Sequence, residues 1–138
     1  MTYSEQAHTN TGKNAWVLGF LCFIPLPFIN LLVCAIAMMA AYPKHKRQSP
    51  ALARENARRA ANWGATLILG LLLCAAYMVV MAMTLDSTKG FFPIGWGIVG
   101  YLALGLVHLV VTVAGSLRAG KGKVFRAAPA LPFFPDRT

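Results

Sequence analysis

The sequence "FIPLPFIN", residues 23–30, interrupts a hydrophobic stretch that carries no charged residue from Ala15 to Tyr42. Pro25 and Pro27 each lack a backbone amide donor and clash with the preceding helical turn, so we expect no straight helix through them. Each proline also pushes the residue before it toward extended geometry. A stretch that would otherwise cross a bilayer is therefore predicted to be broken near its middle.

The break leaves two half-helices, Ala15–Phe23 and Phe28–Tyr42, of about 14 and 22 Å, each shorter than the roughly 30 Å hydrocarbon core. Exposed backbone is costly in lipid, so the break must lie against other protein or near water. We expect Asn30 to offer its side-chain amide to the backbone groups freed at the start of the second half-helix. We favour a re-entrant hairpin with both ends inside; a kinked crossing with the N-terminus outside is the alternative.

Two further stretches, Trp63–Leu85 and Phe91–Leu117, also carry no charge, and each is long enough to cross a bilayer as a helix. The chain of 138 residues is 57% hydrophobic and only 12% charged, whereas about a quarter of residues are charged in soluble domains. We therefore expect a single-domain, all-α membrane protein with two full transmembrane helices, the broken N-terminal segment and an amphipathic interfacial helix start.

The distribution of Lys and Arg predicts the orientation, because short cytoplasmic loops hold the excess of these residues. The predicted segments are a polar N-terminus (1–14), the broken segment (15–42), a basic cytoplasmic linker (43–62), two transmembrane helices (63–85 and 91–117, joined outside by "DSTKG") and a basic cytoplasmic tail (118–138). We expect contacts with anionic lipid headgroups from Lys44, Lys46, Arg47, Arg54, Arg58, Arg118, Lys121, Lys123 and Arg126. These contacts explain the net charge of +9 without nucleic acid.

Two stripes of small and polar residues recur at helical spacing on the predicted helices. The sequence "SPALARENARRAANW" starts as a helix should, with Ser49 as N-cap and Pro50 at the first position. The first stripe comprises Glu55, Arg59, Asn62, Thr66, Gly70, Tyr77 and Met81, and the second comprises Gly97, Tyr101, Gly105, His108, Thr112 and Gly115. Because small residues let helices approach closely in lipid, we expect these two faces to meet.

No catalytic, cofactor or metal site is predicted. His108 lies deep in the last span, and we interpret it as a neutral imidazole with one partner across a helix interface, the alternative being a proton or ligand role. Glu55 is interpreted as a structural partner of Arg58 and Arg59. The histidines His8, His45 and His108 are scattered, and the cysteines Cys22, Cys34 and Cys74 are expected to behave as small hydrophobic residues.

The chain resembles the DUF4870 family of small bacterial membrane proteins, which are similar to Tic20, a chloroplast import component. The residues that carry the resemblance are Ser49, Pro50, Glu55, Ala60, Asn62 and Trp63, followed in the tail by Ala119, Gly122, Phe125 and Pro129. It covers residues 15–133 and implies a four-segment membrane architecture with both termini inside.

The predicted function is that of a non-enzymatic accessory or scaffold protein of the bacterial cytoplasmic membrane. Its C-terminus is expected to be cytoplasmic, and its packing faces would serve a membrane-protein partner or a homo-oligomer. The alternative, implied by the resemblance to Tic20, is a transport or protein-translocation component. That alternative requires a water-filled path lined by Asn30, Thr66, His108 and Thr112.

Overall fold

The computed structural model describes residues 11–25, 29–46, 50–84 and 92–135, and within these ranges every regular element is helical. Expectations for Arg47, for the cap at Ser49 and for the "DSTKG" connection lie outside the described residues. The elements in chain order are helix α2 (Lys13–Val17), the 3-10 helix η1 (Leu18–Phe23), helix α3 (Asn30–Lys46), helix α4 (Ala51–Thr84) and helix α5 (Phe92–Gly120).

The predicted break in the first hydrophobic segment is confirmed. Helical structure stops at Phe23, Ile24 adopts extended geometry with ψ 127°, and the next helix starts at Asn30. Two details differ from the expectation. The first arm changes from α to 3-10 geometry at Leu18, and α3 continues through Pro43 to Lys46. A proline removes one backbone hydrogen bond from a helix, and at Pro43 less than one further turn follows, so the helix tolerates it.

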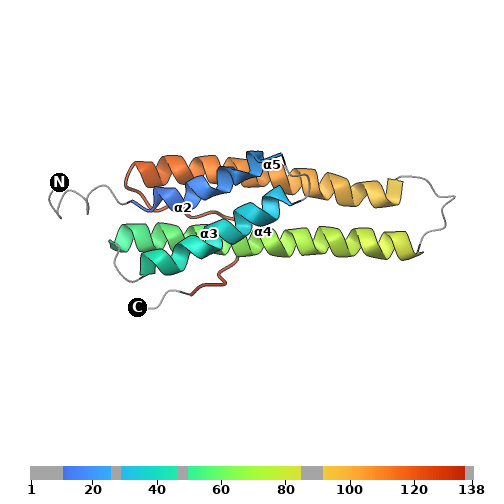
Figure 1. Ribbon diagram of the computed structural model, residues 1–138, viewed down its shortest axis with the longest axis horizontal. Coiled ribbons are helices and arrows are strands. Elements are labelled where there is room, and N and C mark those ends of the chain that lie inside the picture. The colour runs from blue at the N-terminus through green and yellow to red at the C-terminus, as the bar shows by residue number, and fades with distance from the viewer. Residues whose placement is uncertain (1–10, 26–28, 47–49, 85–91, 136–138) are drawn as a thin grey trace.

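Helices α4 and α5 are the long pair of the fold and run side by side (Figure 1). Both are long and apolar enough to cross a membrane by length and composition. The arm formed by α2 and η1 runs along one half of this pair, and α3 returns along it, so the two arms form a hairpin (Figure 1). The basic linker is not a loop throughout, since its second half forms the first turns of α4.

The core lies where the hairpin covers the long pair. One cluster of buried side chains gathers around Trp16, Trp63 and several alanines, and a second, smaller cluster joins Leu31, Ala35 and Leu67. The alanines and glycines along α4 let α2 and α3 approach its backbone closely, as small residues do between membrane helices. The core therefore occupies only part of the length of α4 and α5.

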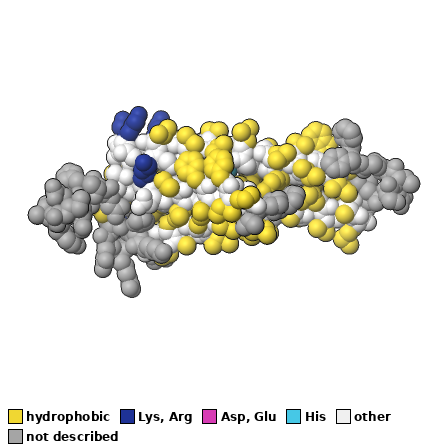
Figure 2. Space-filling view, turned by 45° about the horizontal axis from the view of Figure 1, so that its top comes forward, with side chains coloured by type: hydrophobic (Ala, Val, Ile, Leu, Met, Phe, Trp, Pro, Cys, Tyr) yellow, Lys and Arg dark blue, Asp and Glu magenta, His cyan; other side chains and the backbone are white. Residues whose placement is uncertain are grey.

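The rest of α4 and α5 exposes a belt of apolar side chains, which we call the apolar belt. Of the most hydrophobic 18-residue window in each helix, only 6% is buried in α4 and 22% in α5. Large exposed members of the belt are Leu72, Leu73, Val79, Val80, Met83, Val99, Leu102, Leu106 and Val110. Figure 2 shows one face of the molecule, with hydrophobic side chains along its length and exposed Lys and Arg side chains at one end. Soluble monomers rarely expose continuous apolar surface on this scale.

Candidate functional site

His108 lies at the centre of a buried polar group and is completely shielded from solvent. The indole Nε1 of Trp63 donates a hydrogen bond to Nδ1 of His108 at 3.0 Å, and the two ring planes are nearly parallel, at 10°, with centroids 6.3 Å apart. The other ring nitrogen, Nε2, lies 2.9 Å from the carbonyl oxygen of Gly19. Because Nδ1 accepts a hydrogen bond, it carries no proton, so Nε2 carries the ring proton and donates a hydrogen bond to that carbonyl. The ring is therefore a neutral imidazole with two close partners, where the sequence predicted one, and the Thr112 hydroxyl lies farther away, 3.5 Å from Nε2.

A close approach between η1 and α5 brings the Gly19 carbonyl to His108. A Cβ atom on Gly19 would lie only 2.5 Å from Oγ1 of Thr112, which is one helical turn beyond His108. A second close approach occurs nearer the C-terminal end of α5, where Gly115 packs directly against the indole ring of Trp16. Both contacts depend on glycine because any larger residue would push the first arm of the hairpin away from α5.

The cysteines of the two hairpin arms lie next to this group. The Sγ atoms of Cys22 on η1 and Cys34 on α3, together with a ring nitrogen of His108, all lie within 4.8 Å of one another. Cys34 and His108 are buried and Cys22 is half-buried. Sequence reasoning missed this cluster, since its members belong to three separate elements and have no characteristic spacing. Cys74 lies apart from it, against Gly100 of α5.

Asn30 closes the break in the hairpin. Its Oδ1 accepts hydrogen bonds from the backbone amide of Leu31 at 2.9 Å and from the Tyr101 hydroxyl at 2.7 Å. Its Nδ2 donates to the carbonyl of Cys22 at 2.8 Å. Asn30 thus binds one of the amides freed at the start of α3, as its position after the prolines predicted, and it also joins α3 to η1 and α5.

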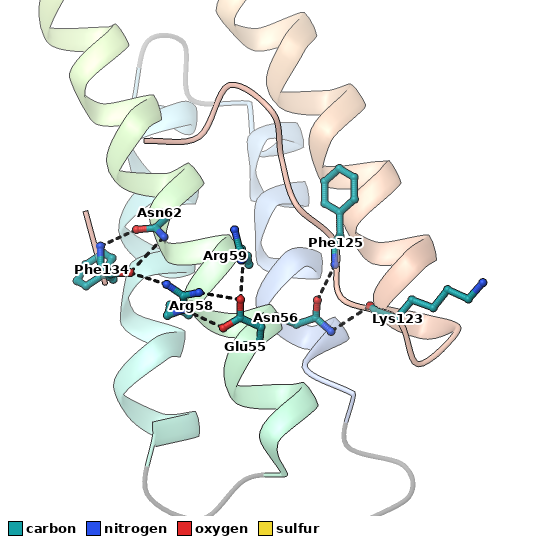
Figure 3. A network of polar contacts seen from close by, with 8 residues as sticks. All are labelled: Glu55, Asn56, Arg58, Arg59, Asn62, Lys123, Phe125 and Phe134. Atoms are coloured by element: carbon teal, nitrogen blue, oxygen red, sulfur yellow. Dashed lines mark hydrogen bonds and ion pairs between the residues drawn. The ribbon is translucent and has the colours of Figure 1, made fainter. Parts of the chain in front are cut away.

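The first turns of α4 bind the C-terminal segment, residues 121–135, through side-chain amides (Figure 3). Oδ1 of Asn56 accepts from the backbone amide of Phe125 at 3.1 Å, while its Nδ2 donates to the carbonyls of Thr11 and Lys123 at 2.8 and 3.3 Å. Asn56 is fully buried. One side chain therefore ties the start of the described chain and the C-terminal segment to α4.

Asn62 and Arg58 bind the far end of the same segment (Figure 3). Asn62 accepts from the amide of Phe134 at 2.7 Å, and Arg58 donates to the Phe134 carbonyl at 2.9 Å. The hydroxyl of Thr66 accepts from the amide of Leu131 at 2.9 Å. These hydrogen bonds involve only backbone atoms of the segment, so they fix its path and do not depend on which side chains it carries.

Glu55 pairs with both neighbouring arginines, as expected, at 2.7 Å from Arg58 and 2.7 Å from Arg59. Burial by itself raises the pKa of the Glu55 carboxyl, but the hydrogen bonds and charges of the two arginines outweigh it and hold the pKa below its ordinary value. The expectation of a headgroup contact for Arg58 needs correction, since this side chain is only 8% exposed. Its guanidinium donates hydrogen bonds to Glu55 and to the Phe134 carbonyl.

The other predicted headgroup residues with described side chains are all exposed. They are Arg54, Arg118, Lys121, Lys123 and Arg126, and Figure 2 shows exposed Lys and Arg side chains at the end where the hairpin lies. The side chains of Lys44 and Lys46 are not among those described. An exposed cationic end next to an apolar belt is the arrangement that anionic headgroups favour.

The structure brings together only part of the two predicted stripes. At the far end, Tyr77 donates to the carbonyl of Pro93 at 2.9 Å, Gly97 lies against Tyr77 and Met78, and Gly70 lies against Leu104. Nearer the hairpin, the stripe on α5 contacts residues of the two hairpin arms. Gly105 faces Leu31 of α3, and Tyr101 donates a hydrogen bond to Asn30 of α3. His108 and Thr112 lie next to Gly19 of η1, and Gly115 lies against Trp16 of α2. On α4, Asn62 and Thr66 bind the C-terminal segment.

The residues proposed to line a path therefore lie in different groups. Asn30 belongs to one hydrogen-bonded cluster, His108 and Thr112 belong to another, and Thr66 faces the C-terminal segment. A helical stripe shows which side of a helix is small or polar. Which neighbour covers that side depends on the whole packing.

No curated protein and no solved structure matches this chain. One family model does match, over residues 9–134, and it corrects the resemblance stated above: the matched family is neither DUF4870 nor Tic20-like, and the translocation alternative loses its support. The motifs that carried that resemblance are mostly helix starts and stops, which unrelated membrane proteins share. The chain belongs to the MamF/MmsF family, the magnetosome magnetite crystal formation protein family.

Proposed function

We propose that this chain is a small integral protein of the membrane in which magnetite crystals form, and that it acts there as an accessory or scaffold subunit without catalysing a reaction. The family match supports the biological setting. The apolar belt on α4 and α5 carries the proposal, because water would make so large an apolar surface unstable and lipid would cover it.

In this proposal α4 and α5 are the two full spans and the hairpin is re-entrant. At about 1.5 Å per residue, α3 reaches roughly 26 Å and the first arm less, while α4 and α5 each exceed the hydrocarbon core of about 30 Å. Figure 1 supports this, since the hairpin turns back before the end of the long pair. The basic end would then face the cytoplasm, with Arg118, Lys121 and Lys123 near anionic headgroups.

Contact with a partner helix or a second copy would use the face between α4 and α5 that the hairpin leaves open. A groove of about 480 Å³ runs along this face and is lined by Gly70, Cys74 and Gly100 among mainly apolar side chains. Small residues of this kind allow another membrane helix to approach closely. The C-terminal segment borders the groove through Pro129, so a partner at the groove would lie beside that segment.

Membrane insertion can be tested with a matched pair of leucine substitutions. Leu106 and Leu131 are both exposed, at 65% and 45%, but only Leu106 lies in a proposed span, α5. Leu106→Arg should lower the amount of protein that stays with membranes after an alkaline carbonate wash, because arginine within a span costs about 2.5–3.5 kcal/mol. Leu131→Arg should not. Equal membrane retention of the two variants, or a wild-type chain that washes off, would refute the membrane proposal.

The role in crystal formation requires a separate experiment in a magnetite-forming bacterium that encodes this chain. Deleting its coding sequence should change the size or number of crystals seen by electron microscopy, and the wild-type chain should restore them. The Leu131→Arg variant should restore them equally well, whereas Leu106→Arg should not. Crystals unchanged by the deletion would refute this role and leave the membrane result unaffected.

A further inference from the structure

We propose that Cys22, Cys34 and His108 form a binding site for one thiophilic divalent metal cation, with Zn²⁺ as the ion that fits it best. The three donor atoms lie within 4.8 Å of one another in the core, where three elements converge. Two sulfurs and one imidazole nitrogen make up a ligand set that zinc accepts in proteins, with the fourth position left open. The proposed site is independent of the role in crystal formation.

The geometry needs little adjustment. Zinc binds sulfur at about 2.3 Å and imidazole nitrogen at about 2.0–2.1 Å in a tetrahedral arrangement, which separates neighbouring ligand atoms by roughly 3.5–3.8 Å. Donor atoms that already lie within 4.8 Å of one another therefore need to close by no more than about 1.3 Å, given those bond lengths. Side-chain rotation supplies movements of this size without shifting the helices.

The charge of the complex selects a divalent ion. Binding releases one proton from each thiol, and the two thiolates then neutralise a cation of charge two while the imidazole stays neutral. An uncharged complex avoids the cost of placing a net charge in the low-dielectric interior of a protein within lipid. A monovalent ion on the same two thiolates would leave one negative charge uncompensated there.

Binding must also break the hydrogen bond between Trp63 and His108, whichever ring nitrogen takes the metal. If Nδ1 binds, the cation replaces the indole N–H that now lies 3.0 Å away, and Nε2 keeps its bond to the Gly19 carbonyl. If Nε2 binds, the ring proton moves to Nδ1, which can no longer accept from the indole, and the bond from Nε2 to the Gly19 carbonyl is lost as well. Coordination by two thiolates and an imidazole outweighs the one hydrogen bond lost in the first case and the two lost in the second. The fluorescence of Trp63 should therefore change when a metal binds, because its indole loses its hydrogen bond to His108.

The test uses the full chain, purified in mild detergent, reduced, and stripped of metal with a chelator. Added Co²⁺ should produce thiolate-to-cobalt charge-transfer absorption that saturates at one ion per chain and disappears when Zn²⁺ displaces it. Tryptophan fluorescence should change with the same saturation. The Trp63→Phe variant should keep the cobalt absorption and lose most of the fluorescence change, because the three ligands remain.

Cys74 is a matched control, since it is a half-buried cysteine outside the cluster. Cys22→Ser and His108→Gln should each weaken Co²⁺ binding by more than about a hundredfold. Losing a residue that only orients a metal ligand weakens binding by at most about a hundredfold, so a larger loss identifies a direct ligand. Cys74→Ser should leave binding unchanged. In the wild-type chain, which needs no substitution to fold, Zn²⁺ should slow alkylation of Cys22 but not of Cys74, as read by mass spectrometry.

The proposal is overturned if the reduced chain shows no charge-transfer absorption. It is also overturned if Cys74→Ser weakens binding as much as Cys22→Ser, or if Zn²⁺ slows alkylation of both cysteines equally. A chain in which Cys22 and Cys34 only form a disulfide, and bind no Co²⁺ after reduction, would likewise refute it.

Discussion

Replacing Gly115 with alanine should destabilise the protein through its contact with Trp16. The added Cβ would overlap Cδ2 and Cε3 of the indole ring, whereas carbon atoms at favourable contact lie about 3.5–4.0 Å apart. Trp16 is completely buried and packs edge-on against Phe125 at a centroid distance of 5.3 Å. The ring therefore cannot move aside without disturbing the core.

The magnitude follows from a comparison with Gly105→Ala on the same helix. At Gly105 the added Cβ would lie 3.7 Å from Cδ1 of Leu31, an ordinary contact. Both substitutions gain the same helix propensity, about 0.8–1 kcal/mol for glycine to alanine. That gain cancels in the difference between the variants, which leaves the cost of overpacking, about 1–3 kcal/mol.

The assay is reversible unfolding of the purified chain in detergent, followed by circular dichroism. Gly115→Ala should have a free energy of unfolding about 1–3 kcal/mol below that of Gly105→Ala. Gly105→Ala itself should match or exceed the wild type. If Gly115→Ala is as stable as Gly105→Ala, then α2 does not pack on α5 as described, and the close approach of the hairpin to the long pair is refuted.

Three further predictions concern the polar contacts. Trp63→Phe removes the donor to Nδ1 of the buried His108 and should lower the free energy of unfolding by about 1–3 kcal/mol in the same assay; an unchanged value would contradict the bond. Asn62→Ala removes the contacts to the end of the C-terminal segment and should speed limited chymotrypsin cleavage there, unlike Asn14→Ala, whose side chain is exposed. The paired carboxyl of Glu55 has a lowered pKa when folded, so its contribution to stability is present above the ordinary value of 4.5 and is lost as pH falls below it toward the folded pKa. Unfolding measured from neutral pH down through that window should show a loss that Glu55→Gln lacks, and identical pH profiles would exclude the ion pairs as its source.

The family assignment shows the limit of short motifs as a guide. Pro50 before α4 and the glycine-containing stretch after α5 are real boundary signals, because α4 begins at Ala51 and α5 ends at Gly120. Neither signal distinguishes this family from others. A capping residue or a stop glycine reports the local free energy of a helix end, which is the same in unrelated proteins.

The amino-acid sequence by itself determined the features that depend on neighbouring residues and on the solvent. The break before Asn30 follows from proline chemistry, and the two long apolar helices follow from uncharged length. Only the tertiary structure decided that Asn56 and Asn62 hold the C-terminal segment, and that His108 meets Trp63, Gly19 and two cysteines. The physical reason is that each of these contacts joins residues far apart in the chain, and its free energy exists only once the hairpin has packed against α4 and α5.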